Sequence, residues 1–397
     1  MGEDDSTPGR ATRAIHARVP APAVSSEPLA PPLVQSASFA FDSLEDMDAV
    51  ISRPNSGYSY SRIRNPTTAA LEKAVADLEG AEDAVAFGSG MAAIDAVFGA
   101  MLTAGDHVVV PESVYGGTHG LLTRKWSRCN VSCTFARTAD PSAYAEAIRP
   151  NTRLLYLETI ANPTLEVPDL TAFADLARSR GLRLVVDSTL ATPELCRPLA
   201  WGADVVIHSA SKYLGGHGDL LAGVVVAKTE LLKPIRRHLI LAGAACAPFA
   251  AWLVSRGLQT LSLRMERHCA SARRLAEHLA NHAKVARVLY PLSADETAES
   301  PAHRFLGGRG GGVVSLVLHG GERAAWSFAD RLRWFRRASG LGEAQSLVLV
   351  PRIASQRSMR ASERARAGID DGFVRLSIGL EEPADLLEDL DQALQAG

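Results

Sequence analysis

Two side chains that could carry out chemistry follow neighbouring apolar runs in the sequence. Asp187 ends the run RLVVD, and Lys212 lies further along, just after Ser209 and Ser211 and before a glycine pair. A partly buried lysine has a lowered pKa and can form a Schiff base with an aldehyde cofactor. A carboxylate behind apolar residues needs a partner, which can be a backbone cap, an arginine or a protonated ring nitrogen. A lone lysine is usually a solvated surface charge, so it is the pair that favours a pyridoxal-phosphate site.

A turn suited to phosphate precedes a helical pattern that starts near Met91. Residues 88–91 (GSGM) supply small side chains and backbone N–H groups at a helix N-terminus, and Ser209 and Ser211 supply hydroxyls. Ser-Gly before a helix is also a common N-cap, so this turn alone does not identify a phosphate site. Tyr115 could stack on a planar ring, although taken singly the pattern favours an ordinary core tyrosine.

Short β-branched runs alternate with helical patterns and predict the sheet that positions these residues. Apolar strands separated by helices are typical of a parallel sheet covered on both faces, so we expect an α/β fold. Ligands bind at the carboxyl ends of such strands. Those ends carry residues 88–90, Glu158, Asp187 and 209–212, which should converge on one crevice. The expected strand runs are residues 84–90, 107–112, 153–159, 183–189, 204–210 and 222–228.

Three regions are expected along the chain. Residues 1–60 form an N-terminal arm, because their first half is rich in Pro, Ala and Ser and cannot build a core. Residues 61–255 form a large cofactor-binding domain with a mostly parallel sheet, and residues 256–397 form a smaller C-terminal α+β domain. In the smaller domain we expect a glycine-rich turn at residues 307–312 and an arginine-dense helix over residues 325–339.

The composition argues against several classes of protein. Lysine and arginine total 42 against 44 aspartate and glutamate, for a net charge of −2, so we expect no nucleic-acid partner. No apolar run is long enough for a membrane helix, and the acidic N-terminus is unlike a secretion signal. Five cysteines indicate free thiols in a reducing cytoplasm. His208 and His217 lack supporting Cys or carboxylate residues, so we expect no metal site.

Several motifs in chain order resemble one family of pyridoxal-phosphate enzymes. The resemblance to the Cys/Met-metabolism enzymes runs from about Ala11 to the C-terminus; these are the cystathionine γ-synthases and γ-lyases, methionine γ-lyases and O-acylhomoserine sulfhydrylases. It implies the aspartate-aminotransferase-like fold type I, pyridoxal 5′-phosphate as cofactor, an amino-acid substrate, and a homotetramer built from two catalytic dimers. The motifs are YSRIRNPT, EGAEDAVAFGSGMAAI, YGGT, ETIANPT, VVDSTLATP, GADVVIHSASKYLGGHGD and DGFVRLSIGLEEPADLLEDLDQAL.

The resemblance also implies a role for individual residues. It makes Lys212 the lysine that binds the cofactor and moves protons, and Asp187 the partner of the pyridinium nitrogen. Tyr115 stacks on the ring and, like Tyr60 of the neighbouring subunit, can act as an acid. The remaining implied contacts are Gly90, Met91, Ser209 and Ser211 with the phosphate, Tyr60 and Arg62 with the neighbour's phosphate, Asn162 with the phenolic oxygen, and Arg375, Ser339 and Gly340 with the substrate.

The implied reaction is γ-replacement or γ-elimination on an L-amino acid substituted at Cγ. The alternatives are a β-lyase acting on cystathionine or cysteine, and a non-catalytic paralogue that only binds the cofactor. The sequence departs from the family's usual pattern on the substrate side, which predicts a specialised member with an altered pocket, unless these changes are tolerated and the substrate is ordinary. The departures are Gly117, Ser188, Leu190, Ser339, Gly340 and residues 350–356 (VPRIASQ).

Overall fold

The computed structural model describes residues 28–53, 56–293, 297–357 and 359–395. Residues 33–397 form one compact unit and residues 1–32 a second, of which only residues 28–32 are described, without helix or strand. The first half of the expected arm therefore lies outside the described residues. The rest of the arm includes α2 (Leu44–Ser52), a helix in which no residue is buried.

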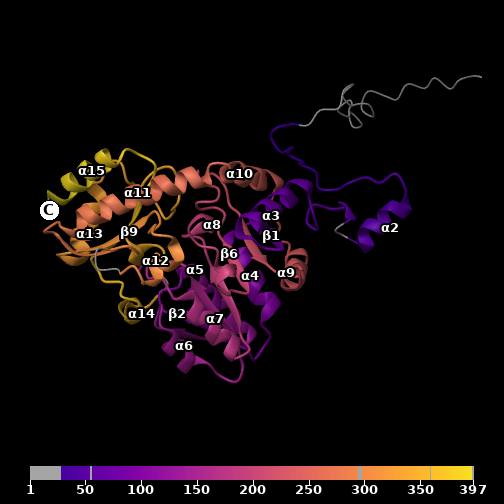
Figure 1. Cartoon of the computed structure of the whole chain (residues 1–397), viewed down its shortest axis with the longest axis horizontal. Helices are drawn as coiled ribbons and strands as arrows, with labels where there is room; N and C mark the ends of the chain where they lie inside the picture. Colours follow the sequence, from indigo (N-terminus) through magenta and orange to yellow (C-terminus); the bar gives the residue numbers. More distant parts are fainter. Residues whose placement is uncertain (1–27, 54–55, 294–296, 358, 396–397) are drawn as a thin grey trace, which may run out of the picture. The chain divides into compact units, whose positions relative to one another are not determined.

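The larger sheet has seven strands in the order β1-β7-β6-β5-β4-β2-β3. Three of them, β1, β6 and β2, are labelled in Figure 1. It is mostly parallel, as expected, but β7 is antiparallel to both of its neighbours because no helix crosses over between β6 and β7. All six expected runs form strands, whereas β3 was not expected. The strands are β1 (Asp83–Phe87), β2 (His107–Pro111), β3 (Ser132–Ala136), β4 (Thr152–Glu158), β5 (Arg183–Asp187), β6 (Val205–His208) and β7 (Gly223–Ala227).

Helices cover both faces of this sheet. Alternate residues of each strand enter two separate apolar clusters, as the two-residue period of a strand requires. One cluster includes α3 (Pro66–Glu79), α7 (Leu170–Ser179) and α10 (Pro248–Leu258). The other includes α4 (Gly90–Met101) and α9 (Thr229–Ala242). The shorter helices are α5 (Gly116–Gly120), η2 (Leu121–Lys125), η3 (Trp126–Cys129), α6 (Pro141–Ala147), α8 (Thr192–Leu195) and η4 (Pro198–Trp201).

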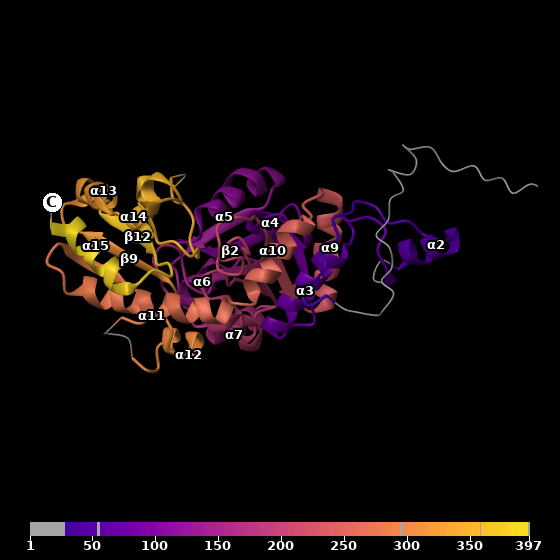
Figure 2. The ribbon, with the colours of Figure 1, turned by 90° about the horizontal axis from the view of Figure 1, so that it is seen from above.

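The C-terminal part of the chain builds a second sheet, in the order β10-β11-β12-β9-β8. Its strands pair antiparallel except for β10 with β11. Figure 2 shows α11, α13 and α15 gathered around β9 and β12. The elements are α11 (Leu261–Ala280), β8 (Val285–Leu289), α12 (Pro301–Leu306), β9 (Val313–Leu318), α13 (Gly321–Arg331), β10 (Arg336–Arg337), β11 (Leu347–Leu349), η5 (Pro351–Ile353), α14 (Ala361–Arg366), β12 (Phe373–Ser377) and α15 (Pro383–Gln395).

Two expectations for this region had different outcomes. The glycine-rich stretch 307–312 forms a turn, with positive φ at Gly307, Gly308 and Gly311. The arginine-dense helix expected over 325–339 is wrong beyond Arg331, where α13 ends. The reason is tertiary: the carboxylate of Asp389, from α15, accepts the backbone N–H groups of Arg333 and Trp334, two and three residues beyond Arg331, at 2.8–3.0 Å.

None of the described helices combines the length and the apolar character needed to cross a lipid bilayer.

Candidate active site

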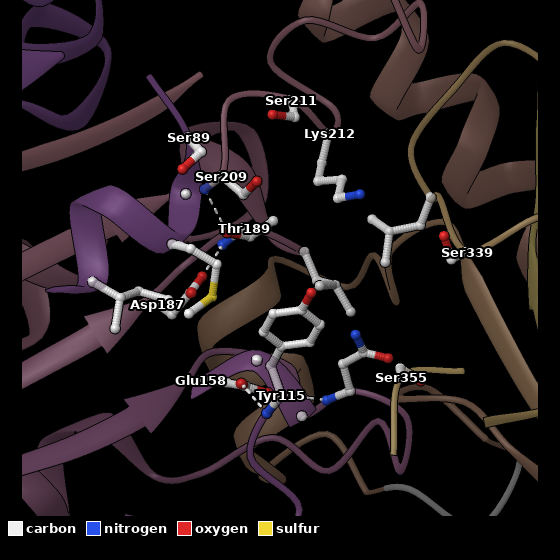
Figure 3. A pocket seen from close by; sticks show the side chains of 18 of the residues that line it. Ser89, Tyr115, Glu158, Asp187, Thr189, Ser209, Ser211, Lys212, Ser339 and Ser355 are labelled. Atoms are coloured by element: carbon white, nitrogen blue, oxygen red, sulfur yellow. Dashed lines mark hydrogen bonds between the residues drawn. The ribbon is translucent and has the colours of Figure 1, made fainter. Parts of the chain in front are cut away.

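A cavity of about 770 Å³ lies at the carboxyl ends of the parallel strands. Figure 3 shows Asp187, Lys212, Tyr115 and Glu158 around it, from four different segments of the chain. Thirteen residues were given an individual role at the site from the sequence, and ten of them line this cavity. They are Gly90, Met91, Tyr115, Asn162, Asp187, Ser209, Ser211, Lys212, Ser339 and Arg375. The other three, Tyr60, Arg62 and Gly340, do not line it.

One end of the cavity is a tight backbone cradle. Ser89 caps α4, its hydroxyl accepting the Ala92 N–H at 3.1 Å, and leaves the first amides of the helix facing outward. A side chain at Gly90 would place its Cβ 2.7 Å from Cβ of Ser209, so only glycine allows this approach. Backbone amides at a helix N-terminus beside serine hydroxyls form an arrangement that suits a phosphate group.

The serine loop is itself held in place by local hydrogen bonds. The amide of Ser209 donates to the hydroxyl of Thr189 at 2.8 Å. The hydroxyl of Ser211 accepts the Ala222 N–H at 3.0 Å and lies 3.2 Å from the Ala222 carbonyl oxygen, to which it donates. Thr189 was not among the residues expected at the site, although it lies two residues after Asp187 at the same strand end.

Asp187 presents a carboxylate at the base of the cavity. One oxygen accepts the Thr189 N–H at 2.9 Å and the other accepts the Tyr156 hydroxyl at 3.3 Å. Burial raises the pKa of Asp187, and the hydrogen bonds from Thr189 oppose that rise. A cation placed against this carboxylate would offset the cost of its burial, which suits a protonated ring nitrogen.

Lys212 extends into the cavity from the loop after β6. Burial lowers the pKa of its amine, and the positive charge of Arg375 lowers it further, while Glu343 acts in the opposite direction. A lysine with a lowered pKa is more often neutral near pH 7 and can then act as a nucleophile or a base.

Tyr115 projects into the cavity as the residue just before α5, with 39% of its surface exposed. A Cβ added at Gly117 would lie 2.4 Å from Cε1 of this ring and 2.8 Å from the sulfur of Met91. The Tyr115 ring and the Met91 sulfur can therefore occupy their positions only because residue 117 has no side chain. Burial raises the pKa of the Tyr115 hydroxyl, which keeps it a proton donor at neutral pH.

Arg375, from β12, is a buried arginine in the wall, only 2% exposed. Its Nη1 donates to Oδ1 of Asn162 at 3.1 Å and its Nη2 to the carbonyl oxygen of Gly340 at 2.8 Å. Its Nε is buried without a hydrogen-bond partner among the described residues. Burial lowers the pKa of Arg375 to about 10, so the side chain remains charged and suits a carboxylate ligand.

Gly340 contributes a carbonyl group to Arg375 instead of lining the cavity. A Cβ at this position would lie 2.3 Å from Oε1 of Glu343 and 3.0 Å from Cδ1 of Leu347. A serine could stand here only if the Glu343 side chain moved. The glycine at this position, one of the departures noted in the sequence, thus leaves room for the Glu343 carboxylate.

The segment 350–357 contributes Ala354, Ser355 and Arg357 to the cavity wall. Gly116 touches its backbone so closely that an added Cβ would lie 1.7 Å from the carbonyl oxygen of Ser355. Gln356 is fully buried and its Nε2 donates to the Asn162 carbonyl oxygen at 3.2 Å. Arg352 does not line the cavity and forms an ion pair with Glu322.

Tyr60 and Arg62 lie outside this cavity. The guanidinium carbon of Arg62 is 5.5 Å from the centre of the Tyr60 ring, and its Nη1 donates to the Ile240 carbonyl oxygen at 2.5 Å. Tyr60 is 43% exposed. One chain alone therefore does not bring these two side chains to its own Lys212.

Glu158 lies in the cavity, as expected of a strand end, but the sequence assigned it no individual role. It ends β4 and is a register partner of Asp187, so both carboxyls reach the same wall. Its position as the last, polar residue of an apolar strand was the available signal, since the carboxyl ends of parallel strands are where ligands bind.

Comparisons with known proteins agree with this geometry. The model of the family described as "Cys/Met metabolism PLP-dependent enzyme" matches residues 11–395. The chain is 41% identical to L-methionine γ-lyase of Pseudomonas putida, covering 100% of both chains. It is 43% identical to cystathionine γ-synthase of Mycobacterium bovis, covering 97% of each.

The fold matches as well. Cystathionine γ-lyase from Lactobacillus plantarum, in its crystal structure with L-serine, superposes with a TM-score of 0.86 at 36% identity, covering 92% of this chain and 93% of that one. The expected fold type I is thereby confirmed. The cradle at Gly90, the carboxylate of Asp187 and the amine of Lys212 also fit the phosphate, ring nitrogen and aldehyde of pyridoxal 5′-phosphate. The chain therefore belongs to the Cys/Met-metabolism pyridoxal-phosphate-dependent enzymes.

Proposed function

We propose that this enzyme catalyses γ-replacement or γ-elimination on an L-amino acid that carries a leaving group at Cγ. The observation that carries the proposal is the meeting of three groups in one cavity: the Lys212 amine, the Tyr115 hydroxyl and the buried Arg375 guanidinium. The first two can move protons and the third can hold a carboxylate. The relatives named above include both lyases and a synthase, which supports either outcome at Cγ.

The residues around the cradle hold the cofactor in this proposal. The amides of Gly90 and Met91, with Ser209 and Ser211, take the phosphate, and Asp187 takes the ring nitrogen. Tyr115 stacks on the ring, and Asn162 lies toward the phenolic oxygen. When bound, pyridoxal phosphate withdraws electrons from the substrate and so makes its Cα and Cβ protons acidic.

The substrate is held and deprotonated by this chain's own residues. Arg375 binds the α-carboxylate, with its guanidinium kept in place by Asn162 and Gly340. The Lys212 amine, neutral when it acts, takes the Cα proton and then moves a proton at Cβ. Tyr115 donates a proton to the group that leaves Cγ, and Tyr60 of a neighbouring copy is the other candidate for that step.

The wall that faces the substrate side chain supports an altered specificity. Ser339, Leu341, Ala354 and Ser355 line it, in segments where the sequence departs from the family's usual pattern. Changes in such a wall alter which side chain fits more than they alter the chemistry at the cofactor. We therefore propose a specialised substrate or nucleophile.

A shared active site is part of the proposal. Tyr60 is exposed and, with Arg62, lies outside its own chain's cavity. We propose that both residues reach the phosphate of a second copy, in a homotetramer built from two such dimers. The cross-subunit contribution predicts that Arg62→Ala weakens retention of the cofactor.

The test is a product analysis on the purified protein loaded with pyridoxal phosphate. O-acetyl-L-homoserine is supplied with and without L-cysteine, and the products are identified by mass spectrometry. Elimination yields 2-oxobutanoate, ammonia and acetate, whereas replacement yields acetate and a thioether joined at Cγ. If L-cystathionine gives pyruvate and no substrate reacts at Cγ, the enzyme is a β-lyase. Cofactor binding without turnover of any of these compounds or of O-succinyl-L-homoserine would contradict the proposed reaction at Cγ.

A further inference from the structure

Glu158 accepts two hydrogen bonds from backbone groups that cannot pair with anything but an acceptor. One carboxylate oxygen accepts the Tyr115 N–H at 2.8 Å, and the other accepts the Asn162 N–H at 3.1 Å (Figure 3). The ionised carboxylate is the better acceptor for both, because it carries the full negative charge and has no hydrogen to turn toward either N–H donor. The geometry therefore calls for a negative charge on Glu158.

The surroundings of Glu158 oppose that charge. The side chain is buried, and its register partner on the next strand is the carboxylate of Asp187. Burial and the charge of Asp187 raise the pKa of Glu158 to about 8, against the two hydrogen bonds that favour ionisation. Ionisation of both Glu158 and Asp187 is thus unfavourable, because the two negative charges would repel each other in a poorly solvated wall.

Both hydrogen-bond partners of Glu158 lead to groups that handle the substrate. Tyr115 carries the ring and the hydroxyl that face the cavity. The side-chain oxygen of Asn162 accepts a hydrogen bond from the Arg375 guanidinium at 3.1 Å. The position of the Asn162 backbone therefore helps to set the position of the Arg375 guanidinium. The Glu158 carboxylate therefore binds the backbone of two segments, at Tyr115 and at Asn162, whose side chains contact or position the proposed substrate.

We propose that Glu158 is a positioning residue that couples the pairing of Asp187 with the cofactor's cationic ring nitrogen to the placement of Tyr115 and Arg375. A positive ring nitrogen beside Asp187 cancels the charge that disfavours ionisation of Glu158. The ionised carboxylate then holds both amides, and the substrate groups are set only once the cofactor is in place. The inference rests on the proposed role of Asp187.

Other charged and titratable groups face this pair from every side. The groups near Glu158 are Tyr144 from α6, Tyr156 from β4, Tyr115 at the start of α5 and, through Asn162, Arg375 from β12. His208 from β6 acts on Asp187, and Lys212 lines the same cavity. Burial raises the pKa values of the three tyrosines, so they remain neutral through the range in which Glu158 titrates.

Proton release on binding of pyridoxamine phosphate tests the coupling. This probe carries the same ring and phosphate but has no aldehyde, so the reaction with Lys212 does not contribute. Calorimetry of the full-length apoprotein at pH 7.5, in two buffers of different ionisation enthalpy, gives the number of protons released. We expect the wild type to release about half a proton more than Glu158→Gln. Glu166→Gln is the control, because burial also raises the pKa of Glu166 but its side chain lies outside the cavity.

The steady-state constants give a second readout. In Glu158→Gln an amide –NH₂ faces one backbone N–H, so we expect KM for the amino-acid substrate to rise by roughly tenfold or more. Equal proton release in wild type and Glu158→Gln would overturn the proposal. If the glutamine variant does not fold, Glu158→Asp decides: it keeps the charge but cannot reach both amides, and an unchanged KM there would equally overturn it. Failure of the wild type to bind the probe would instead contradict the cofactor contacts proposed above.

Discussion

Glu158 and Asp187 are register partners at the ends of β4 and β5, and so one buried and one partly buried carboxyl share one wall of the cavity. Asp187 accepts one backbone N–H and a tyrosine hydroxyl, whereas Glu158 accepts two backbone N–H groups. A slip of one residue between these strands would turn one carboxyl to the other face of the sheet. The register thus decides which of the two accepts from Thr189 and Tyr156, the one we propose to meet the cofactor ring, and which accepts from the backbone of Tyr115 and Asn162.

Replacing Lys212 by alanine removes the only amine that the described residues bring to this cavity. We expect Lys212→Ala to lose the visible absorption band of lysine-bound pyridoxal phosphate and to lower kcat by at least about a thousandfold, since both the covalent link and the base disappear. Spectra and turnover of the purified variant provide the measurement. A band that persists unchanged would show that another group binds the cofactor.

Gly117 and Gly120 offer a matched pair within one short helix. An alanine at 117 would push its Cβ against the Tyr115 ring and the Met91 sulfur, whereas at 120 nothing lies within 4 Å of an added Cβ. We expect Gly117→Ala to lower kcat/KM between about 10- and 100-fold through displacement of the ring. Gly120→Ala should leave it unchanged. Equal effects of the two substitutions would mean that the helix backbone, and not the ring, is responsible.

Arg124 and Arg357 also line the cavity, and neither forms an ion pair within the described part of the chain. Two unpaired guanidiniums favour a substrate whose γ-substituent ends in an anion. We expect wild type to prefer O-succinyl-L-homoserine over O-acetyl-L-homoserine. Arg124→Met and Arg357→Met should each reduce that preference by about three- to tenfold. The exposed Arg128 provides the control, Arg128→Met, and a preference that survives in both test variants would remove these residues from substrate selection.

His268 makes stability depend on pH. It is fully buried, its Nδ1 lies 2.7 Å from the carbonyl oxygen of Ile378, and burial lowers its pKa from 6.5 to about 4. The unfolded chain therefore takes up a proton more readily, so stability is complete above pH 6.5 and falls by about 3 kcal/mol as the pH drops to 4.

Unfolding in urea at pH 7.5, 6 and 5 measures this dependence. His268→Gln should show a weaker loss of stability between pH 7.5 and 5 than the wild type. His319→Gln, which alters an exposed histidine, should lose stability in parallel with the wild type. Identical slopes for all three proteins would place the pH dependence elsewhere.

The local pattern of the sequence is enough to predict much of the sheet and of its functional edge. β-branched runs form strands because buried strands favour such side chains, and all six expected runs do so. Parallel strands bring their carboxyl ends to one edge whatever the loops between them, so Asp187, Lys212 and the Gly90 turn could be expected together. The motifs that resemble the family added Tyr115, Asn162 and Arg375, which also line the cavity.

Other features depend on contacts between distant segments, which no local pattern contains. Arg375 donates a hydrogen bond to Asn162, which lies 213 residues earlier in the sequence. The helix α13 ends early because Asp389, from a later helix, accepts hydrogen bonds from the backbone amides of Arg333 and Trp334. The role of Glu158 emerges only when Tyr115, Asn162 and Asp187 surround it. Hydrogen bonding and burial at such positions are set by the whole packed chain, so the charge that each carboxyl carries is decided by the tertiary structure alone.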